Sequence, residues 1–263
     1  MLKTIGKITK YPRLTLKYPK KPMDNCLFIG APEIDRALCT LCGDCALRCP
    51  SRAVVIDKAT TSIGINMDEC VFCALCEDIC PTGAARMTNA FELAQKDRGL
   101  LRVSEPAQDC GTMTGETVEN VEDHLAEKIK KKFGRSLQIR EVDAGSCNGC
   151  DYEANALNNP FNDVERLGIH FVASPRHADM LLVTGCVSRN MELALIKTYN
   201  ATPDPKLVVA VGACACSGGI FRDAYAARSG IGSILPVDVY IPGCPPRPQA
   251  IMYGILKAIN RLK

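Results

Sequence analysis

Short apolar runs alternate with helix-like stretches throughout the second half of the chain. The helix-like stretches cover residues 153–157, 189–199 and 248–262. The apolar runs, each short enough for one strand, cover residues 137–142, 169–173, 180–183, 207–211 and 237–241. This order predicts an α/β domain built on a parallel sheet. In such sheets, ligands gather at the carboxyl ends of the strands.

The first half of the chain has only small apolar runs, and they lie between two cysteine-rich stretches. Residues 53–56 and 62–66 look like the two strands of a hairpin, with turn residues at 57–61. Strands of this size suit a small α+β domain that is stabilised largely by bound metal.

A charged segment separates these two regions. Residues 111–115 contain glycine and threonine and predict a flexible start. Residues 116–132 carry acidic side chains early and lysines late, which is the order that a helix dipole favours. We therefore expect two domains, at 1–110 and 136–263, joined by a charged helical connector at 111–135.

The first 22 residues form a basic arm. They contain seven lysines and arginines and no acidic residue, and Pro12, Pro19 and Pro22 favour an extended backbone. An arm of this kind can lie on a neighbouring subunit or contact anionic lipid headgroups. The subunit contact is the favoured interpretation.

Composition excludes several classes of function. A formal charge of +3, no tryptophan and 5% aromatic residues give no basis for nucleic-acid binding. The phosphate-loop and Gly-x-Gly-x-x-Gly patterns are absent, so we expect no nucleotide. No apolar run approaches the roughly 18 residues of a membrane-spanning helix. No secretion signal follows the basic arm, and we therefore expect a cytoplasmic protein.

Sixteen cysteines are the main anomaly of the composition. Disulfide scaffolds are normally shorter and secreted, so reduced thiols that bind metal are the better interpretation. Cys26 and Cys110 have no partner at a suitable spacing and are expected to be structural.

Two cysteine motifs repeat in the first half of the chain. Residues 39–50 and 70–81 both fit Cys-x2-Cys-x2-Cys-x3-Cys-Pro, with their first cysteines 31 residues apart. In this bacterial ferredoxin pattern, three thiolates bind one cubane cluster while the fourth reaches the other cluster. We expect each fourth cysteine to start a short helix that points away. The two predicted ligand sets are Cys39, Cys42, Cys45 and Cys80 for cluster one, and Cys70, Cys73, Cys76 and Cys49 for cluster two. Zinc sites, the alternative, typically use paired rather than interleaved cysteines.

A third set of cysteines follows three of the apolar runs in the second half. Cys147 and Cys150 lie after the first run, Cys214 after the fourth and Cys244 after the fifth. Four thiolates at one sheet edge match the ligand count of a [4Fe–4S] cluster or a structural zinc. Two ferredoxin-type clusters on the same chain favour a third cluster over zinc.

The motifs resemble known families over nearly the whole chain. Residues 136–263 resemble the small subunit of group 4 membrane-associated [NiFe] hydrogenases and the homologous complex I subunit with the terminal cluster. Residues 1–110 resemble the two-[4Fe–4S] ferredoxin subunit found beside it in formate hydrogenlyase-type complexes. The segments that carry the first resemblance are residues 145–153, 174–179, 212–219 and 238–246.

The resemblance implies a fusion of two subunits that are usually separate. The second domain would have the flavodoxin-like fold of a hydrogenase small subunit. Cys147, Cys150, Cys214 and Cys244 would then ligate the proximal cluster facing a large subunit. Cys186 and Cys216 replace small residues of the relatives, and we interpret both as buried small hydrophobic residues near the cluster.

The spacing of Cys147 and Cys150 distinguishes two branches of these relatives, since complex I relatives have adjacent cysteines there. The spacing here is the hydrogenase form, so the resemblance implies a [NiFe] large subunit as partner. The resemblance also implies membrane-arm subunits and a ferredoxin or a formate or CO dehydrogenase-type electron donor. We expect an oxidoreductase subunit at the cytoplasmic face of the membrane, relaying electrons through three [4Fe–4S] clusters, with catalysis on the partner. The alternatives are a nickel-free complex I-like quinone or sulfur-reducing oxidoreductase, and a zinc structural module.

Overall fold

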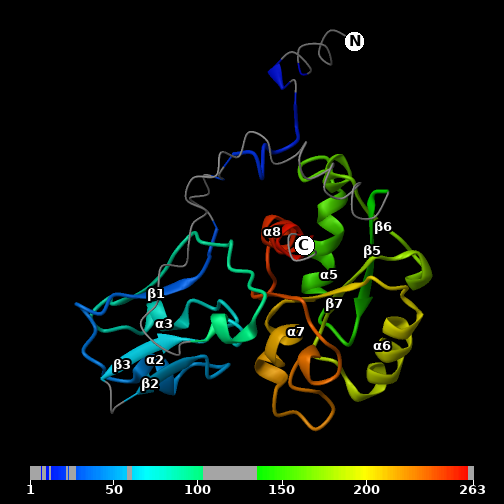
Figure 1. The fold of residues 1–263 in the computed structure, drawn as a ribbon. Coiled ribbons are helices and arrows are strands. Elements are labelled where there is room, and N and C mark those ends of the chain that lie inside the picture. The colour runs from blue at the N-terminus through cyan, green and yellow to red at the C-terminus, as the bar shows by residue number, and fades with distance from the viewer. Residues whose placement is uncertain are drawn as a thin grey trace.

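The computed structural model describes residues 7, 10, 11, 13–21, 23, 28–57, 61–102 and 135–259. It contains two units that lie side by side (Figure 1). We call residues 28–102 the ferredoxin-like unit and residues 135–259 the sheet unit. The expected connector helix, Cys26 and Cys110 lie outside the described residues.

The sheet unit is built on five parallel strands. Their order across the sheet is β6-β5-β7-β8-β9, which is the flavodoxin-like order. The predicted α/β fold is therefore confirmed. The strands are β5 (Leu137–Asp143), β6 (Ile169–Phe171), β7 (Met180–Thr184), β8 (Leu207–Val211) and β9 (Val239–Ile241).

Both faces of the central strands are covered, which explains their uninterrupted apolar sequences. Because side chains alternate between the two faces of a strand, Leu182 and Val209 pack on one face with α8 (Pro248–Ile259). Leu181 and Val208 pack on the other face with α6 (Arg189–Ala201) and α7 (Ala213–Ser217). All residues of β7 and β8 are buried.

The first helix of the sheet unit begins earlier than its sequence indicated. α5 covers Gly149–Asn155 and continues into a 3-10 turn at Ala156–Asn158, whereas a helix was expected at 153–157. Asn148 adopts a left-handed conformation (φ 68°) that turns the chain directly into the helix. The helix therefore starts between Cys147 and Cys150 and carries the second of them.

The ferredoxin-like unit contains two small antiparallel pairs. The predicted hairpin is confirmed as β2 (Val54–Asp57) paired with β3 (Ser62–Ile65). A second pair joins β1 (Pro32–Ile34) to β4 (Ala85–Met87), and the sequence analysis did not anticipate it. Strands of three residues are too short to show an alternating pattern.

Two short helices carry the third cysteine of each motif. α2 (Asp44–Leu47) contains Cys45, and α3 (Leu75–Asp78) contains Cys76. The expectation that each fourth cysteine starts a helix is wrong, because both helices end before that cysteine is reached. The proline after each fourth cysteine explains why the preceding helix ends ahead of that cysteine, because the position before a proline disfavours helical backbone.

The N-terminal arm and a later segment tie the two units together. The described part of the arm contacts its own chain: Leu16 N donates to Phe161 O at 2.8 Å, and Tyr18 is buried. Gln95 forms an antiparallel bridge with Tyr240, so the ferredoxin-like unit extends the edge of the sheet next to β9. Within the described ranges, no helix has the length and apolar character needed to cross a membrane.

Candidate metal centres

The structure brings the two ferredoxin-type cysteine sets around two separate hollows. Each hollow receives three cysteines from one motif and the fourth from the other motif. Cys45 also borders the second hollow, so the two sites are neighbours. Cys39, Cys42, Cys45 and Cys80 line the first hollow, and Cys49, Cys70, Cys73 and Cys76 line the second.

The fourth cysteine of each motif accepts hydrogen bonds from the loop that follows it. Ala53 N donates to Cys49 Sγ at 3.3 Å, and Ala85 N donates to Cys80 Sγ at 3.5 Å. Burial raises the pKa of Cys49, but hydrogen bonds from Val54, Ser51 and Ala53 outweigh it, and the net pKa is lowered. The backbone of Ala85 is the main cause that lowers the pKa of Cys80, to about 7. These two thiolates are stabilised by the protein itself.

The cysteines within the motifs are affected in the opposite direction. Burial raises the pKa of Cys70 to about 12, and the nearby Cys76, Cys49 and Cys73 add to the shift. Burial is also the main cause that raises the pKa of Cys45 and Cys76. When these thiols ionise, the thiolates repel one another unless a cation lies between them. Metal binding must therefore displace the thiol protons.

The third set gathers at the carboxyl ends of β5, β8 and β9. Hydrogen bonds join the loops after β8 and β9: Gly212 N donates to Ile241 O, and Ala213 N donates to Gly243 O, both at 2.8 Å. A Cβ atom at Gly212 would lie 2.5 Å from Cys150 Sγ. Gly212 also has a φ of 90°, in the left-handed region that favours glycine. The glycine therefore leaves the room that the Cys150 sulfur occupies.

The four thiols of the third set lie within electrostatic reach of one another. Burial raises the pKa of Cys150, and Cys214, Cys244 and Cys147 raise it further. Burial and then Cys244 raise the pKa of Cys214 to about 12. For Cys244 the causes of the raised pKa are burial, Cys147 and then Cys73 of the ferredoxin-like unit.

Two aspartates hold the loop that carries Cys147, and the sequence analysis missed both. Asp143 accepts hydrogen bonds from the backbone of Gly145 and Ser146 at 2.8 and 2.7 Å. Asp151 accepts from the Thr184 hydroxyl at 2.6 Å and also from Ser146. An aspartate at the end of a strand with small residues after it is a turn signal that could have indicated Asp143.

Glu141 lies behind this loop and shares a hydrogen bond with Asp151. Burial, followed by the hydrogen bond and the charge of Asp151, raises the pKa of Glu141 to about 7. Burial raises the pKa of Asp151, but hydrogen bonds from Glu141, Ser146 and Thr184 outweigh it, and the net pKa falls. The two neighbouring carboxyls are therefore shifted in opposite directions.

Cys186 and Cys216 are buried, as interpreted from the sequence. Cys186 Sγ donates to Gly145 O at 3.6 Å, beside the third set. Cys216 is 1% exposed, packs with the core beneath β8, and its Sγ points to the carbonyl of Ile241 at 3.6 Å. Burial raises the pKa of both thiols.

The residues at all three sites fit an iron–sulfur cluster. Each site offers four thiols, which is the donor set of a cubane cluster, and the third has a glycine where a Cβ would meet one sulfur. In the part of the chain that the structure describes, no three Cys, His, Asp or Glu side chains are arranged to hold a single metal ion. In a cubane, each thiolate binds a different iron atom.

Two family models match the chain. The model for the NADH ubiquinone oxidoreductase 20 kDa subunit matches residues 147–258, and the model for a 4Fe-4S dicluster domain matches residues 38–84. The first covers the cysteines of the third set, and the second covers both ferredoxin motifs.

Known proteins with similar sequences are subunits of oxidoreductases. The chain is 47% identical to "Formate hydrogenlyase subunit 7" of Escherichia coli over 147 residues, which cover 56% of this chain and 58% of that protein. It is 48% identical to "Probable membrane-bound hydrogenase subunit mbhJ" of Pyrococcus furiosus over 136 residues, covering 51% of this chain and 81% of that protein. It is also 50% identical to a subunit of the NADH-quinone oxidoreductase of Geobacter metallireducens, over 43% of this chain and 66% of that protein.

Among solved structures, a chain of the membrane-bound sulfane sulfur reductase, an archaeal respiratory membrane complex, shares 41% sequence identity. The match covers 52% of this chain and 74% of that one, with a TM-score of 0.45. From the sequence matches and the cysteine sites, we conclude that the chain belongs to the family of the NADH ubiquinone oxidoreductase 20 kDa subunit, a family of oxidoreductase subunits, and carries a 4Fe–4S dicluster domain ahead of it.

Proposed function

We propose that this chain is the electron-transfer subunit of a membrane-associated [NiFe] hydrogenase complex, with three [4Fe–4S] clusters. The observation that carries the proposal is the contiguity of the three cysteine sets. Cys45 borders both hollows of the ferredoxin-like unit. Ser217, on the helix that carries Cys214, donates to the carbonyl of Asp68 at 2.7 Å, two residues before Cys70. The domains would be 1–110 and 136–263, with a connector at 111–135.

Each of the three sites has at least one exposed cysteine, and the first two sites are also adjacent to each other through Cys45. Bound clusters would supply one-electron transfer. Cys42 is exposed at the first site, Cys73 at the second, and Cys147 and Cys244 at the third. The proposed ligands are Cys39, Cys42, Cys45 and Cys80, then Cys70, Cys73, Cys76 and Cys49, then Cys147, Cys150, Cys214 and Cys244.

The exposed cysteines of the first and third sites suit two different partners. A ferredoxin or a formate or CO dehydrogenase-type donor would dock at Cys42, and a [NiFe] large subunit would dock at Cys147 and Cys244. Membrane-arm subunits would place the complex at the cytoplasmic face of the membrane. The spaced Cys147–x–x–Cys150 pair supports the hydrogenase assignment, as do the names of two relatives.

A nickel-free complex I-like quinone or sulfur-reducing oxidoreductase is the second candidate. The 50% identity to a subunit of an NADH-quinone oxidoreductase favours it. In that case the chain would hold the same three clusters, and a different large subunit would receive the electrons.

The experiment that separates the two candidates is nickel analysis of the complex purified anaerobically through this chain. Hydrogen evolution is assayed on the same sample with a reduced viologen dye. The hydrogenase proposal predicts nickel together with hydrogen evolution. A complex with its full iron content but without nickel and without hydrogen evolution would contradict the proposal and favour the second candidate.

A further inference from the structure

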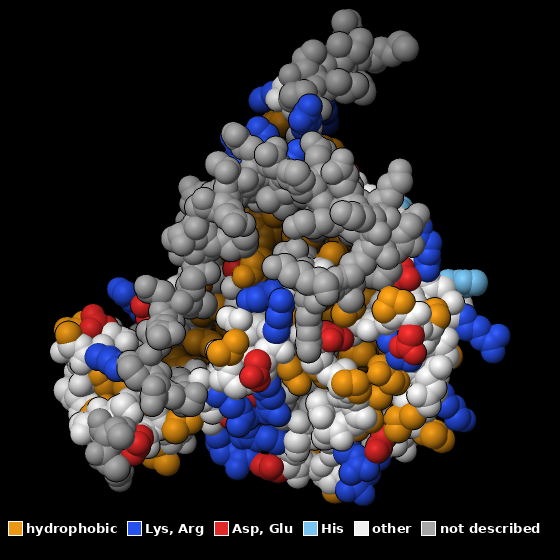
Figure 2. Space-filling view, in the orientation of Figure 1, with side chains coloured by type: hydrophobic (Ala, Val, Ile, Leu, Met, Phe, Trp, Pro, Cys, Tyr) orange, Lys and Arg blue, Asp and Glu red, His pale blue; other side chains and the backbone are white. Residues whose placement is uncertain are grey.

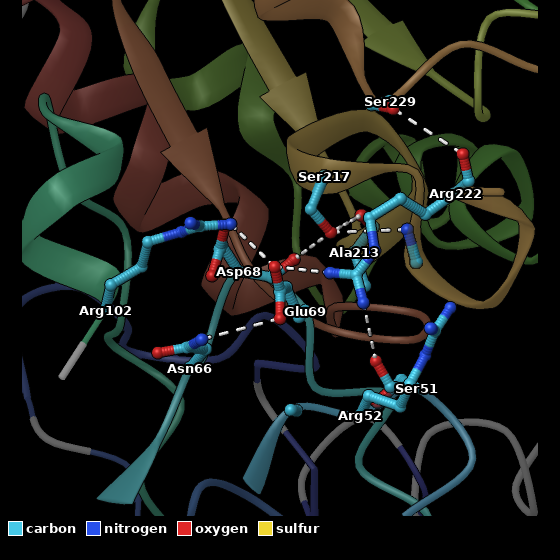
Figure 3. Close-up of polar contacts among 12 residues, drawn as sticks. Ser51, Arg52, Asn66, Asp68, Glu69, Arg102, Ala213, Ser217, Arg222 and Ser229 are labelled. Atoms are coloured by element: carbon cyan, nitrogen blue, oxygen red, sulfur yellow. Dashed lines mark hydrogen bonds and ion pairs between the residues drawn. The ribbon is translucent and has the colours of Figure 1, made fainter. Parts of the chain in front are cut away.

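A network of charged side chains crosses the boundary between the two units (Figure 3). Its acidic members, Asp68 and Glu69, are buried in the ferredoxin-like unit directly before Cys70. Arg98 and Arg102 come from the same unit, at a 3-10 turn over Arg98–Leu101. Arg222 reaches in from the sheet unit, where it follows the 3-10 turn Gly219–Phe221.

Three arginines pair with the two carboxylates. Arg98 Nε lies 2.6 Å and Arg102 Nε 3.1 Å from Asp68 Oδ2. Arg102 also pairs with Glu69 Oε1, at 2.6 Å from its Nη2. The Nη1 of Arg222 pairs with the same Glu69 oxygen. Because the carboxylates are almost inaccessible to water, their charges depend on these partners.

Two further contacts cross the same boundary. Arg222 Nη2 donates to the Ser51 carbonyl at 3.3 Å, and the Ser217 hydroxyl donates to the Asp68 carbonyl at 2.7 Å. An exposed pair, Arg52 with Asp223, lies at the rim. Figure 2 shows Lys and Arg side chains gathered where the ferredoxin-like unit meets the sheet unit.

The positions of these contacts in the sequence connect them to the cysteine sites. Ser51 follows Cys49 by two residues, and Glu69 immediately precedes Cys70. Ser217 follows Cys214 by three residues and lies on the same helix, α7. These contacts therefore join the loops that carry second-set cysteines to the helix that carries a third-set cysteine and to the turn that follows it.

We propose that Arg222 is a positioning residue for electron transfer, because it and its network fix the separation between the second and third cysteine sites. This inference rests on the proposed function as an electron-transfer chain. Tunnelling between two redox centres slows exponentially as their separation grows. Contacts between the segments that carry the proposed ligands fix the distance between the two sites more directly than contacts elsewhere on the two units do.

Two properties of the network, the geometry of its donors and its burial, suit it to hold these segments together. A guanidinium presents several donors in a rigid plane, so Arg222 can hold Glu69 and the Ser51 carbonyl at the same time. Burial protects the pair from screening by salt. Lysine has a single charged nitrogen, so Arg222→Lys would keep the charge and lose one of the two contacts.

The test compares the intact complex with its Arg222→Gln and Arg222→Lys variants. The matched control is Arg228→Gln, which removes an arginine that pairs with Glu192 at 2.8 Å within the sheet unit alone. Three properties are measured: iron and sulfide content, magnetic coupling between the second and third reduced clusters by EPR, and the rate of reduction of the third cluster after mixing with a reduced ferredoxin.

We expect Arg222→Gln to keep its full iron and sulfide content. Because tunnelling slows exponentially with separation, a small increase in the distance between the second and third sites should slow third-cluster reduction severalfold and weaken the magnetic coupling. Arg222→Lys should lie between this variant and the wild type, and Arg228→Gln should match the wild type. Hydrogen exchange should rise at residues 49–52 and 66–70 in Arg222→Gln only.

Three results would overturn the inference: wild-type coupling and rate in Arg222→Gln, equal slowing in Arg228→Gln, or loss of iron with loss of rate. Failure of the proposed function is distinguishable, because the wild-type complex would then lack a third cluster or would not reduce it from the ferredoxin-like unit.

Discussion

The two units of this chain hold cysteines in very different surroundings. The sheet unit has large buried layers on both faces of its sheet, and its cysteine site lies at the edge, beyond the strand ends. The apolar cluster around the hairpin of the ferredoxin-like unit has four buried residues: Ala53, Val54, Ile63 and Ile65. Cys39, Cys45, Cys49 and Cys70 pack directly against that small core.

The contrast indicates that metal binding plays a different role in each unit. In the sheet unit, the buried layers lie apart from the cysteine site, so we expect the fold to form without metal and to present the proposed ligands. In the ferredoxin-like unit, the ligands are a large part of what the core packs against, so cluster binding and folding are coupled. A core of this size is too small to stabilise a unit of its length without such help.

Removal of iron should have the largest effect of the changes considered, and it should affect the two units differently. After anaerobic chelation, we expect the ferredoxin-like unit to lose its structure completely while the sheet unit stays folded. Hydrogen exchange measures this directly, as full loss of protection in β2 and β3 and retained protection in β7 and β8. Protection that survives in β2 and β3 would show that their core does not depend on metal.

A single methyl group at the third site should have the next largest effect. Gly212→Ala would place a Cβ 2.5 Å from Cys150 Sγ, and we expect the loss of roughly four irons per chain, one cubane. Gly168→Ala is the matched control, because Gly168 also has a positive φ (73°) but no atom lies within 4 Å of the added Cβ. Both variants should lose about 1–3 kcal/mol to backbone strain. Only Gly212→Ala should lose iron, and equal iron in the two variants would contradict the crowding argument.

Hydrogen bonds to the fourth cysteines should tune the two clusters of the ferredoxin-like unit separately. The Ser51 and Thr82 hydroxyls lie 3.7 Å from Cys49 Sγ and Cys80 Sγ. A hydrogen bond to a thiolate stabilises the more negative, reduced cluster, so Ser51→Ala and Thr82→Val should each lower one potential by about 20–60 mV.

An EPR-monitored redox titration measures these potentials. Thr82→Ser keeps the hydroxyl and serves as the control. The third cluster should keep its potential in all three variants. A shift of all three potentials together would indicate a change of fold instead.

The smallest effect concerns the Glu141 carboxyl of the sheet unit. Its folded pKa, raised to about 7, lies above its ordinary value, so the folded state binds a proton that the unfolded state releases. The free energy of unfolding should therefore fall as the pH rises from about 5 to 8. Solvent reaches part of this carboxyl, and we expect a change of about 1 kcal/mol or less.

Hydrogen exchange of β5 at pH 5 and pH 8 measures this dependence. Glu141→Gln should flatten it, because the amide does not titrate. An unchanged dependence in the variant would assign the proton to another group.

Patterns that are local in sequence predicted most of this molecule. The apolar runs predicted β7 and β8 because both faces of these strands are buried. The repeat of cysteines pointed to two neighbouring sites, and cysteines of both motifs do line each of the two hollows. The helix boundaries near the cysteines were less predictable, since the left-handed conformation of Asn148 decides where α5 begins. Pro50 and Pro81 disfavour helical backbone at the cysteines before them.

Contacts between distant residues could not be predicted in the same way. Arg222 meets Ser51 from 171 positions away, and neither residue lies in a recognisable motif. The Asp68 and Glu69 carboxylates resemble ordinary surface charges in the sequence, although both are buried. Only the fold reveals that they lie between two cysteine sites.

The central claim is that one chain holds three clusters in a continuous path. Its most direct test is iron and sulfide analysis of the anaerobically purified chain, combined with spin counting by EPR during reduction. The account predicts about twelve irons and twelve sulfides per chain. It also predicts three reduced spins, with magnetic coupling between the first and second clusters and between the second and third. About eight irons with two spins, or zinc at any of the three sites, would contradict it.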